Sequence, residues 1–159
     1  MSMSTKLTPK ELLEEHHYCV ISMATKDASP WLTPVFYAYD AAWNLYWISS
    51  KNSYHSRIFL ENSKACAVIY RPPSVAQEVS ALYLTGQVII CQDEVLKQAM
   101  PIYFERAGLG VSGKADDYCG DNPCRLYRLK PEQAFSLMEP EWDENLLLDK
   151  RGIVELPEQ

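Results

Sequence analysis

The chain has 159 residues and a mass of 18.2 kDa, the size of one ordinary globular domain. Hydrophobic residues make up 47% of it and charged residues 23%, a composition that excludes intrinsic disorder and a coiled coil. Fifteen Lys and Arg stand against 21 Asp and Glu, and the resulting net charge of -6 disfavours nonspecific binding to the nucleic-acid phosphate backbone.

The acidic charge is concentrated at the C-terminal end of the sequence. Residues 139–159 carry seven acidic and two basic side chains, a net charge of -5, so residues 1–138 are nearly neutral at -1. We therefore divide the chain into a folded body, residues 1–138, and an acidic C-terminal extension, residues 139–159. A solvated tail or a polar covering strand is the form expected of such an extension.

Cysteine usage and the N-terminal residues predict a cytoplasmic protein with reduced thiols. The five cysteines are an odd number, and the first six residues lack the apolar segment of a secretory signal. Residues 28–50 are the only candidate membrane span, and prolines and polar residues within them argue against it. Cys119 and Cys124 are separated by four residues, but the histidines supply no second ligand pair. We therefore expect loop thiols there and no metal site.

Helix and strand signals follow one another along the body. Thr8, Pro9 and Glu11 form a capping box that predicts a short helix up to His17. Alternating apolar residues predict strands at 18–25, 31–39, 45–49, 64–70 and 81–92, and a sixth within 125–138, around 126–129 and 134–137.

Two more helices are expected between these strands. Residues 53–62 form the first; the second has Asp93 as its cap, bends at Pro101 and ends at Gly108. Gly86 marks a bulge or a close approach of two backbones. The order of the elements predicts a small antiparallel barrel with helices at its ends.

The strand at residues 31–39 is apolar on both faces. An antiparallel strand usually leaves one face to water, so its second face must meet a helix, a ligand or another subunit. The residues of one face are Trp31, Val35, Tyr37 and Tyr39, and those of the other are Leu32, Phe36 and Ala38.

A glycine-rich stretch at residues 108–114 matches phosphate-binding fingerprints by its spacing alone. Those fingerprints need a strand before the glycines and a helix after them, whereas here a helix precedes and a polar loop follows. We interpret the stretch as the loop that follows the end of a helix.

The sequence also lacks a nucleophile elbow, so no catalytic residue is identified. Tyr37 and Tyr39 are conceivable proton donors, although strand tyrosines are more often packing residues.

Residues 47–57 carry the best local indication of a ligand site. A strand ends there, a hydroxyl-rich turn follows, and a helix begins, so its unpaired N–H groups and its dipole favour an anion. The side chains that add donors or charge are Ser49, Ser50, Ser53, Lys51, His55 and Arg57. This pattern predicts a site for a dianionic phosphate. An ordinary surface helix capped by serine is the alternative.

From Ser29 to Tyr70 the sequence resembles the pyridoxamine 5'-phosphate oxidase-like superfamily, the FMN-binding split barrels. The shared pattern is an aromatic strand at 31–40, a hairpin into residues 45–50, the helix at 53–62 and the strand at 65–70. In outline the resemblance extends over residues 8–138. It implies a mainly β fold, a six-stranded antiparallel split barrel with a few helices, and a homodimer that binds FMN at its interface.

The resemblance also implies roles for particular residues. The FMN phosphate would be held by Ser49, Ser50, Lys51, His55 and Arg57; the flavin ring would be bordered by Thr33, Pro34, Val35 and Phe36; and Gln87 would reach in from the partner subunit.

The sequence also departs from the oxidases themselves. The basic residues that they carry on the second strand and at the helix start are replaced by Leu32, Tyr37, Tyr54 and His55, and the acidic extension replaces their arginine-rich substrate-binding element. These departures argue against oxidation of vitamin B6.

We therefore expect a homodimeric flavoprotein that uses FMN for two-electron transfer, with NADH or NADPH as electron donor and a small molecule as substrate. Two alternatives remain open at this point. One is a non-catalytic module that binds flavin or haem, and the other is an empty dimeric scaffold of the same fold. Neither nucleic acid nor a membrane is expected as a partner.

Overall fold

The computed structural model of the chain describes residues 6–72, 79–108, 113–139, 141–144, 146–148 and 150–158. Its helices are α1 (Pro9–Glu15), α2 (Tyr54–Glu61), α3 (Asp93–Ala107) and the short 3-10 helix η2 (Ala115–Tyr118). Its strands are β1 (Tyr18–Ala24), β2 (Pro30–Phe36), β3 (Ala38–Tyr39), β4 (Leu45–Ser50), β5 (Lys64–Arg71), β6 (Ser80–Ile90), β7 (Cys124–Leu137), β8 (Glu141–Asp143), β9 (Leu146–Leu148) and β10 (Arg151–Val154).

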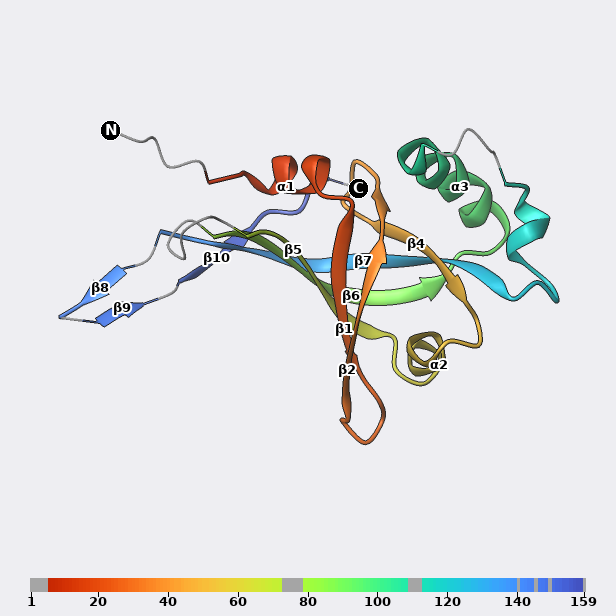
Figure 1. Ribbon diagram of the computed structural model, residues 1–159, viewed down its shortest axis with the longest axis horizontal. Helices are drawn as coiled ribbons and strands as arrows, with labels where there is room; N and C mark the ends of the chain where they lie inside the picture. Colours follow the sequence, from red (N-terminus) through yellow and green to blue (C-terminus); the bar gives the residue numbers. More distant parts are fainter. Residues whose placement is uncertain are drawn as a thin grey trace.

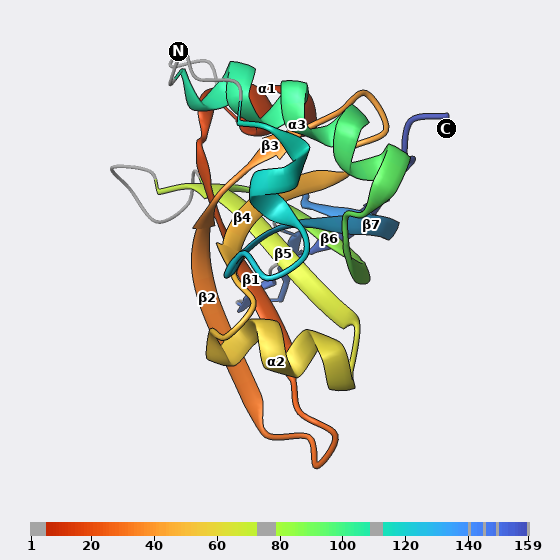
Figure 2. The ribbon, with the colours of Figure 1, turned by 90° about the vertical axis from the view of Figure 1, so that its right-hand side faces the viewer.

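One curled antiparallel sheet dominates the structure (Figure 1). Its strands follow the order β2-β1-β5-β6-β7-β4-β3, and β10 also pairs with β7. Figure 2 shows α2 at one end of the curl and α3 at the other, as the order of the elements predicted. Among the described residues, no helix is long and apolar enough to cross a membrane.

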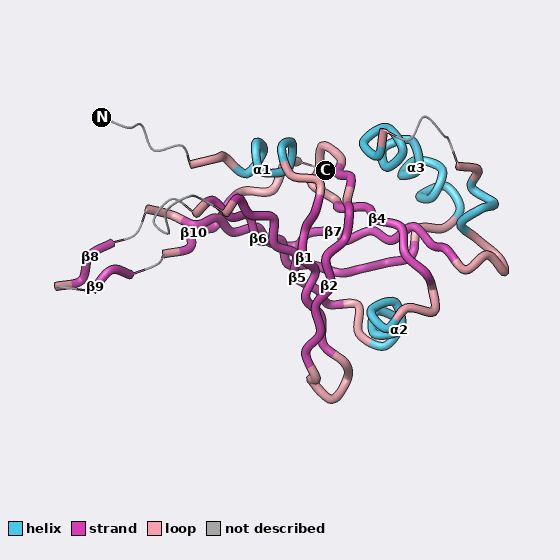
Figure 3. Tube along the Cα trace, in the orientation of Figure 1, coloured by secondary structure: helices cyan, strands magenta, loops and turns pink. Residues whose placement is uncertain are grey.

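The predicted mainly β barrel class is confirmed, and the strand count differs for two reasons. The predicted strand 31–39 is divided into β2 and β3, and β10, from the acidic extension, joins the main sheet. β8 and β9 form a separate hairpin that projects from the sheet (Figure 3). Part of the extension, β10, therefore lengthens the main sheet beside β7.

The strand at 31–39 is interrupted because Tyr37 leaves the sheet. Its N–H donates to the carbonyl of His17 at 3.0 Å, and its hydroxyl donates to the carbonyl of Leu13 at 3.2 Å. The ring is fully buried, and the Arg106 guanidinium lies 5.2 Å from its centre. Burial raises the pKa of the Tyr37 hydroxyl. Tyr37 is therefore a packing residue that joins α1 to the sheet.

The capping box predicted for α1 is present, and the helix is shorter than expected. The Thr8 N–H donates to Glu11 Oε2 at 2.7 Å, and the Glu11 N–H donates to Thr8 Oγ1 at 3.3 Å. The helix ends at Glu15 because His16 is extended. Arg106 of α3 donates to the carbonyls of Leu13 and His16 at 2.5 and 2.7 Å, so a distant cation satisfies the helix C-terminus.

The inner face of the curl holds the main core. Trp47 of β4 is stacked on Tyr127 of β7 at 5.6 Å between ring centres, and Phe59 of α2 lies with its ring centre 5.9 Å from that of Trp47. A second cluster of buried residues lies between α3 and the sheet and includes Tyr46, Leu96 and Leu126.

α3 begins with Gln92 at its cap position, and the expected cap, Asp93, is its first residue. Gly108 ends it at a φ of 64°, as predicted.

Gly86 lies where the backbones of β6 and β7 are close together. The register shifts between Thr85, which pairs with Gln133, and Gly86, which pairs with Pro131. A Cβ atom on Gly86 would collide with the carbonyl oxygen of Lys130 and lie 2.9 Å from the Cα of Pro131. The predicted bulge is confirmed, and β7 continues through it as one long strand.

We expect Gly86→Ala to destabilise the protein by about 3 kcal/mol, because the added methyl group can be accepted only if the backbone of β7 moves. Urea unfolding measures this loss of free energy. Gly152→Ala is the matched control, since its Cβ meets only the half-exposed side chain of Met138, which can move aside. Equal stability of the two variants would contradict the proposed close approach.

Candidate functional site

Three hydroxyl groups and one imidazole meet where β4 ends and α2 begins. We call Ser49, Ser53, His55 and Ser56 the serine–histidine cluster. His55 Nε2 lies 2.7 Å from Ser49 Oγ and 3.0 Å from Ser53 Oγ. Ser53 is the N-cap of α2, and its hydroxyl accepts from the Ser56 N–H at 3.3 Å. The cluster forms because the predicted serine cap and the last residues of β4 share one corner of the fold.

The hydrogen bonds of the cluster favour a proton on His55 Nε2. Ser53 Oγ donates its own proton to Ser56 Oγ at 2.8 Å, so it faces the imidazole as an acceptor. An Nε2–H group shared between the oxygens of Ser49 and Ser53 satisfies both contacts. The Ser49 hydroxyl proton then remains available to a ligand.

His55 is held in its neutral form. The imidazole is half-buried, the ring centre of Phe59 lies 6.3 Å from its own, and burial lowers its pKa from the ordinary value of 6.5. The corner therefore offers neutral hydrogen-bond donors. To these the first turn of α2 adds the N–H groups of Tyr54 and His55, which have no acceptor within the helix.

Lys51 holds the neighbouring loop. Its Nζ donates to the carbonyls of Gly120 and Asp121 at 3.4 and 3.3 Å, and its N–H donates to the carbonyl of Pro123 at 2.7 Å. Ser50 stabilises the turn, since its Oγ accepts from the Asn52 N–H at 3.2 Å. These two predicted site residues are next to the cluster and shape the loop beside it.

Arg125 is a basic residue of this corner that the sequence analysis missed. It lies opposite Ser49 in the pairing of β4 with β7 and donates to the carbonyls of Asn122 and Cys124 at 2.5 and 2.7 Å. The sequence signal was weak, because only the pairing of two distant strands brings it to the cluster. Its charge, like that of Lys51, orders residues 119–124.

An aromatic wall connects α2 to β2. The Tyr54 ring meets the Trp31 ring edge to face at 4.9 Å, and the Arg57 guanidinium lies 5.8 Å from the centre of Tyr54. Trp31 and Tyr54 are each nearly half exposed, at 45% and 46%. Arg57 is therefore at the rim of the corner and contacts an aromatic ring. The sequence analysis identified Arg57 as a candidate site residue but did not predict the aromatic wall of Trp31 and Tyr54.

The four residues expected to border the ring are divided between the two faces of β2. Thr33 and Val35 are paired with Ile21 and Cys19, which point into the core, and so share the side of Trp31. Pro34 and Phe36 lie on the opposite face, and the Phe36 ring meets Tyr103 of α3 at 5.8 Å between centres. Within one chain, only the first pair is on the side of the serine–histidine cluster.

Gln87 lies on β6, and its contact is with another part of the sheet. Its side-chain amide donates to Glu132 Oε1 at 2.7 Å. The structure of one chain therefore does not bring Gln87 to the cluster.

All five cysteines are free, and the described residues contain no group of three or more His, Cys, Asp or Glu side chains able to hold a metal ion.

The convex side of the sheet, which we call the outer face, is apolar and open. Strand pairing aligns one row across six strands: Pro34, Val20, Val68, Tyr83, Phe135 and Ile153. Several large side chains on this face are exposed, among them Tyr18 at 65%, Leu32 at 63% and Ile153 at 83%. An apolar surface that crosses a whole sheet is typical of an interaction surface.

Comparison with known proteins gives matches in structure and none in sequence. No protein-family model matches the chain, and no curated protein matches it. A haem-binding protein of Mycobacterium smegmatis is similar in structure, with a TM-score of 0.65 and 12% identity over 92% of this chain. The chain spans 59% of the length of that protein.

Two further solved structures are similar to this chain over nearly their whole length. One is a candidate pyridoxamine 5'-phosphate oxidase of Listeria innocua, with a TM-score of 0.58 and 19% identity over 77% of this chain and 90% of the other. The second is an FAD-binding protein of Mesorhizobium loti, with a TM-score of 0.60 and 17% identity over 82% and 93%. The chain therefore has the split-barrel fold of the pyridoxamine 5'-phosphate oxidase-like proteins, as the resemblance in its sequence implied.

Proposed function

We propose that the protein is a dimeric flavoprotein that holds the phosphate of FMN at the serine–histidine cluster and uses the flavin for two-electron transfer. The observation that carries this proposal is the convergence of Ser49 and Ser53 on His55 Nε2 at the first turn of α2. Two proteins of similar structure, a candidate pyridoxamine 5'-phosphate oxidase and an FAD-binding protein, support a flavin as the ligand.

The residues of the corner fit a phosphate through neutral donors. Ser49 would donate its hydroxyl proton, and the first N–H groups of α2 would donate along the helix axis. Lys51 and Arg125 would keep the adjoining loop in place, since both are already bonded to its carbonyls. When bound, FMN supplies the hydride chemistry, with NADH or NADPH as electron donor.

The side of β2 that carries Thr33 and Val35 would face the flavin ring, next to the wall of Trp31 and Tyr54. A second subunit would cover the ring and contribute Gln87. The exposed apolar outer face supports such a dimer, because burying it would remove the side chains of Leu32 and Ile153 from water.

Haem binding is the second candidate function, and one feature of the structure favours it. A cavity of about 490 Å³ beside α1 is lined in part by His16, His17, Tyr18 and Tyr70. Among the described residues, His16 Nε2 is buried without a hydrogen-bond partner. Imidazole is a haem ligand, and the mycobacterial protein of similar structure is described as haem-binding. Titration with haemin, followed by its visible absorbance, separates this function from flavin binding.

Ser49→Ala should weaken FMN binding by about 1.5–3 kcal/mol, the size of one charge-assisted hydrogen bond to the phosphate. Riboflavin, which lacks the phosphate, should bind almost as before. Fluorescence titration measures both affinities, and bleaching of bound flavin by NADH or NADPH distinguishes an enzyme from a carrier. Lys97→Ala, on the exposed surface of α3, is the control. An equal loss for both ligands would show that the phosphate is bound elsewhere.

FMN affinity should fall as the pH rises above the pKa of free His55, because a dianion beside Nε2 favours the imidazolium. Burial keeps the pKa of free His55 below 6.5, whereas the bound phosphate raises it, so binding takes up a proton between the two values. His55→Gln should remove this dependence. Riboflavin titrated over the same range is the control. The same slope for wild type and variant would contradict the assignment of His55.

A charge placed in the middle of the outer face should prevent dimer formation. Val68→Glu introduces a carboxylate into the apolar row between Val20 and Tyr83, where a partner would have to desolvate it. Light scattering after gel filtration should give a dimer for the wild type and a monomer for the variant. Leu60→Glu, on the 70% exposed side of α2, should leave the mass unchanged. A monomeric wild-type protein would refute the dimer.

A further inference from the structure

The aromatic wall of Trp31 and Tyr54 is joined by a cation that the flavin proposal does not use. The Arg57 side chain is exposed, and its guanidinium lies 5.8 Å from the centre of the Tyr54 ring. Lys51 and Arg125, by contrast, are bonded to loop carbonyls. The four salt bridges among the described residues use other cations, namely Lys6, Lys10, Lys97 and Lys150. Arg57 therefore keeps its planar set of donors available for an anion.

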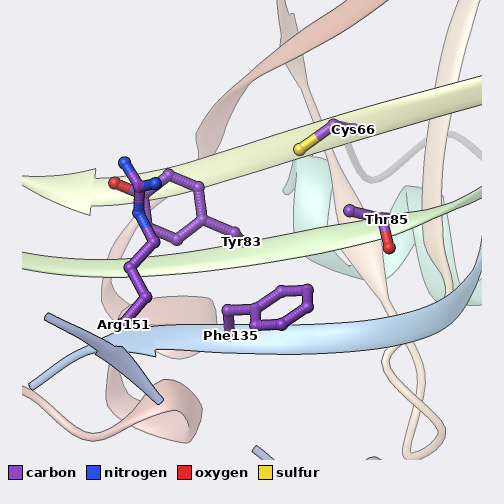
Figure 4. A pocket seen from close by; sticks show the side chains of 5 residues that line it. All are labelled: Cys66, Tyr83, Thr85, Phe135 and Arg151. Atoms are coloured by element: carbon purple, nitrogen blue, oxygen red, sulfur yellow. The ribbon is translucent and has the colours of Figure 1, made fainter. Parts of the chain in front are cut away.

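The wall lies on the opposite side of the sheet from the surface that the proposed dimer buries. Trp31 is paired with Met23, which is buried in the core, so Trp31 is on the core side of β2. A second subunit on the outer face would cover a different set of residues there, the lining of a cavity formed by Cys66, Tyr83, Thr85, Phe135 and Arg151 (Figure 4). The wall would remain accessible in such a dimer, as a site for an exchanging ligand must.

The wall adjoins both parts of the proposed flavin site. Tyr54 is the first residue of α2 and follows the N-cap serine of the serine–histidine cluster. Along β2, Trp31 is followed on the same side by Thr33 and Val35, at steps of about 7 Å. A ligand held at one end by the wall could therefore extend its other end along β2 toward the place proposed for the flavin ring.

We propose that the wall and Arg57 bind the adenosine half of the electron donor and select NADPH over NADH, an inference that rests on the proposed flavoprotein function. The two donors differ by one phosphate, on the 2'-oxygen of the adenosine ribose. In dinucleotide-binding folds an arginine accommodates this phosphate. The Arg57 guanidinium binds it through parallel hydrogen bonds, and the exposed part of the Trp31 ring gives the adenine a surface to stack on. Arg57 is thus a specificity-determining residue for the electron donor.

The first test measures binding alone and needs no flavin. Adenosine 2',5'-bisphosphate carries the distinguishing phosphate, and adenosine 5'-monophosphate lacks it. Calorimetric titration of the full chain should show that the bisphosphate binds about tenfold or more tightly than the monophosphate, the size of one charge-assisted hydrogen bond. Arg57→Gln should remove this difference by weakening the bisphosphate alone. Trp31→Thr, which keeps a strand-forming residue in β2, should weaken both ligands.

The second test uses the flavin-loaded protein and follows bleaching of the bound flavin. The ratio of kcat/KM for NADPH to kcat/KM for NADH should be about ten or more in the wild type. In Arg57→Gln the two values should be nearly equal, because only the value for NADPH falls. A flavin that NADH and NADPH bleach equally well in the wild type would overturn the selection by Arg57 and leave the flavoprotein standing.

Arg71→Gln is the matched control, because Arg71 is the last residue of β5, at the far end of that strand from α2. Thermal unfolding of each variant shows whether it is folded. The proposal is overturned if the wild type binds the two adenosine phosphates equally, or if Arg57→Gln keeps the preference. Displacement of the bisphosphate by FMN would overturn it as well, since the nucleotide would then be in the serine–histidine cluster. Selective binding of the bisphosphate by a protein that takes up no FMN would support the nucleotide site and refute the flavoprotein.

Discussion

The close approach of β6 and β7 at Gly86 sets how β7 is paired along its length. β7 is one strand from Cys124 to Leu137, and along a single edge it pairs first with β4 and then with β10. The register shift opposite Gly86 separates these two halves, because it leaves Glu132 without a partner on β6. The first half aligns Ser49 beside α2, and the second half aligns Arg151 above the outer face. A side chain at residue 86 would push β7 away from β6 and so disturb the strand that aligns Ser49.

As the proposed phosphate site, the serine–histidine cluster would let an acidic protein bind an anion without a concentration of charge. The imidazole is neutral, Lys51 and Arg125 are occupied by loop carbonyls, and Arg57 contacts an aromatic ring. Hydroxyl and N–H donors remain, and their geometry is fixed by the cap of α2. Fixed neutral donors cost less to desolvate than buried cations, so the corner can stay preorganised when no ligand is present.

Local signals in the sequence predicted the elements that local physics controls. The capping box at Thr8, the bulge at Gly86 and the serine cap of α2 each depend on a few neighbouring residues, and all three are present. What the sequence did not reveal depends on partners far along the chain. The Tyr37 hydroxyl donates to the carbonyl of Leu13 in α1, and Arg125 reaches the cluster only through the pairing of β4 with β7. Composition identified the extension as acidic, yet its strand β10 joins the main sheet beside β7.

The two faces of β2 explain why one chain does not complete the proposed flavin site. Thr33 and Val35 share the side of the cluster, while Pro34 and Phe36 belong to the outer face, since strand side chains alternate. The four consecutive residues can all border one flavin ring only at the strand edge, where both faces are accessible. β2 is at the end of the sheet order, and its outer edge has no partner strand among the described residues. In the proposed dimer, a second subunit on the outer face would bury the exposed apolar row, and the open edge of β2 is where the ring could meet residues of both faces.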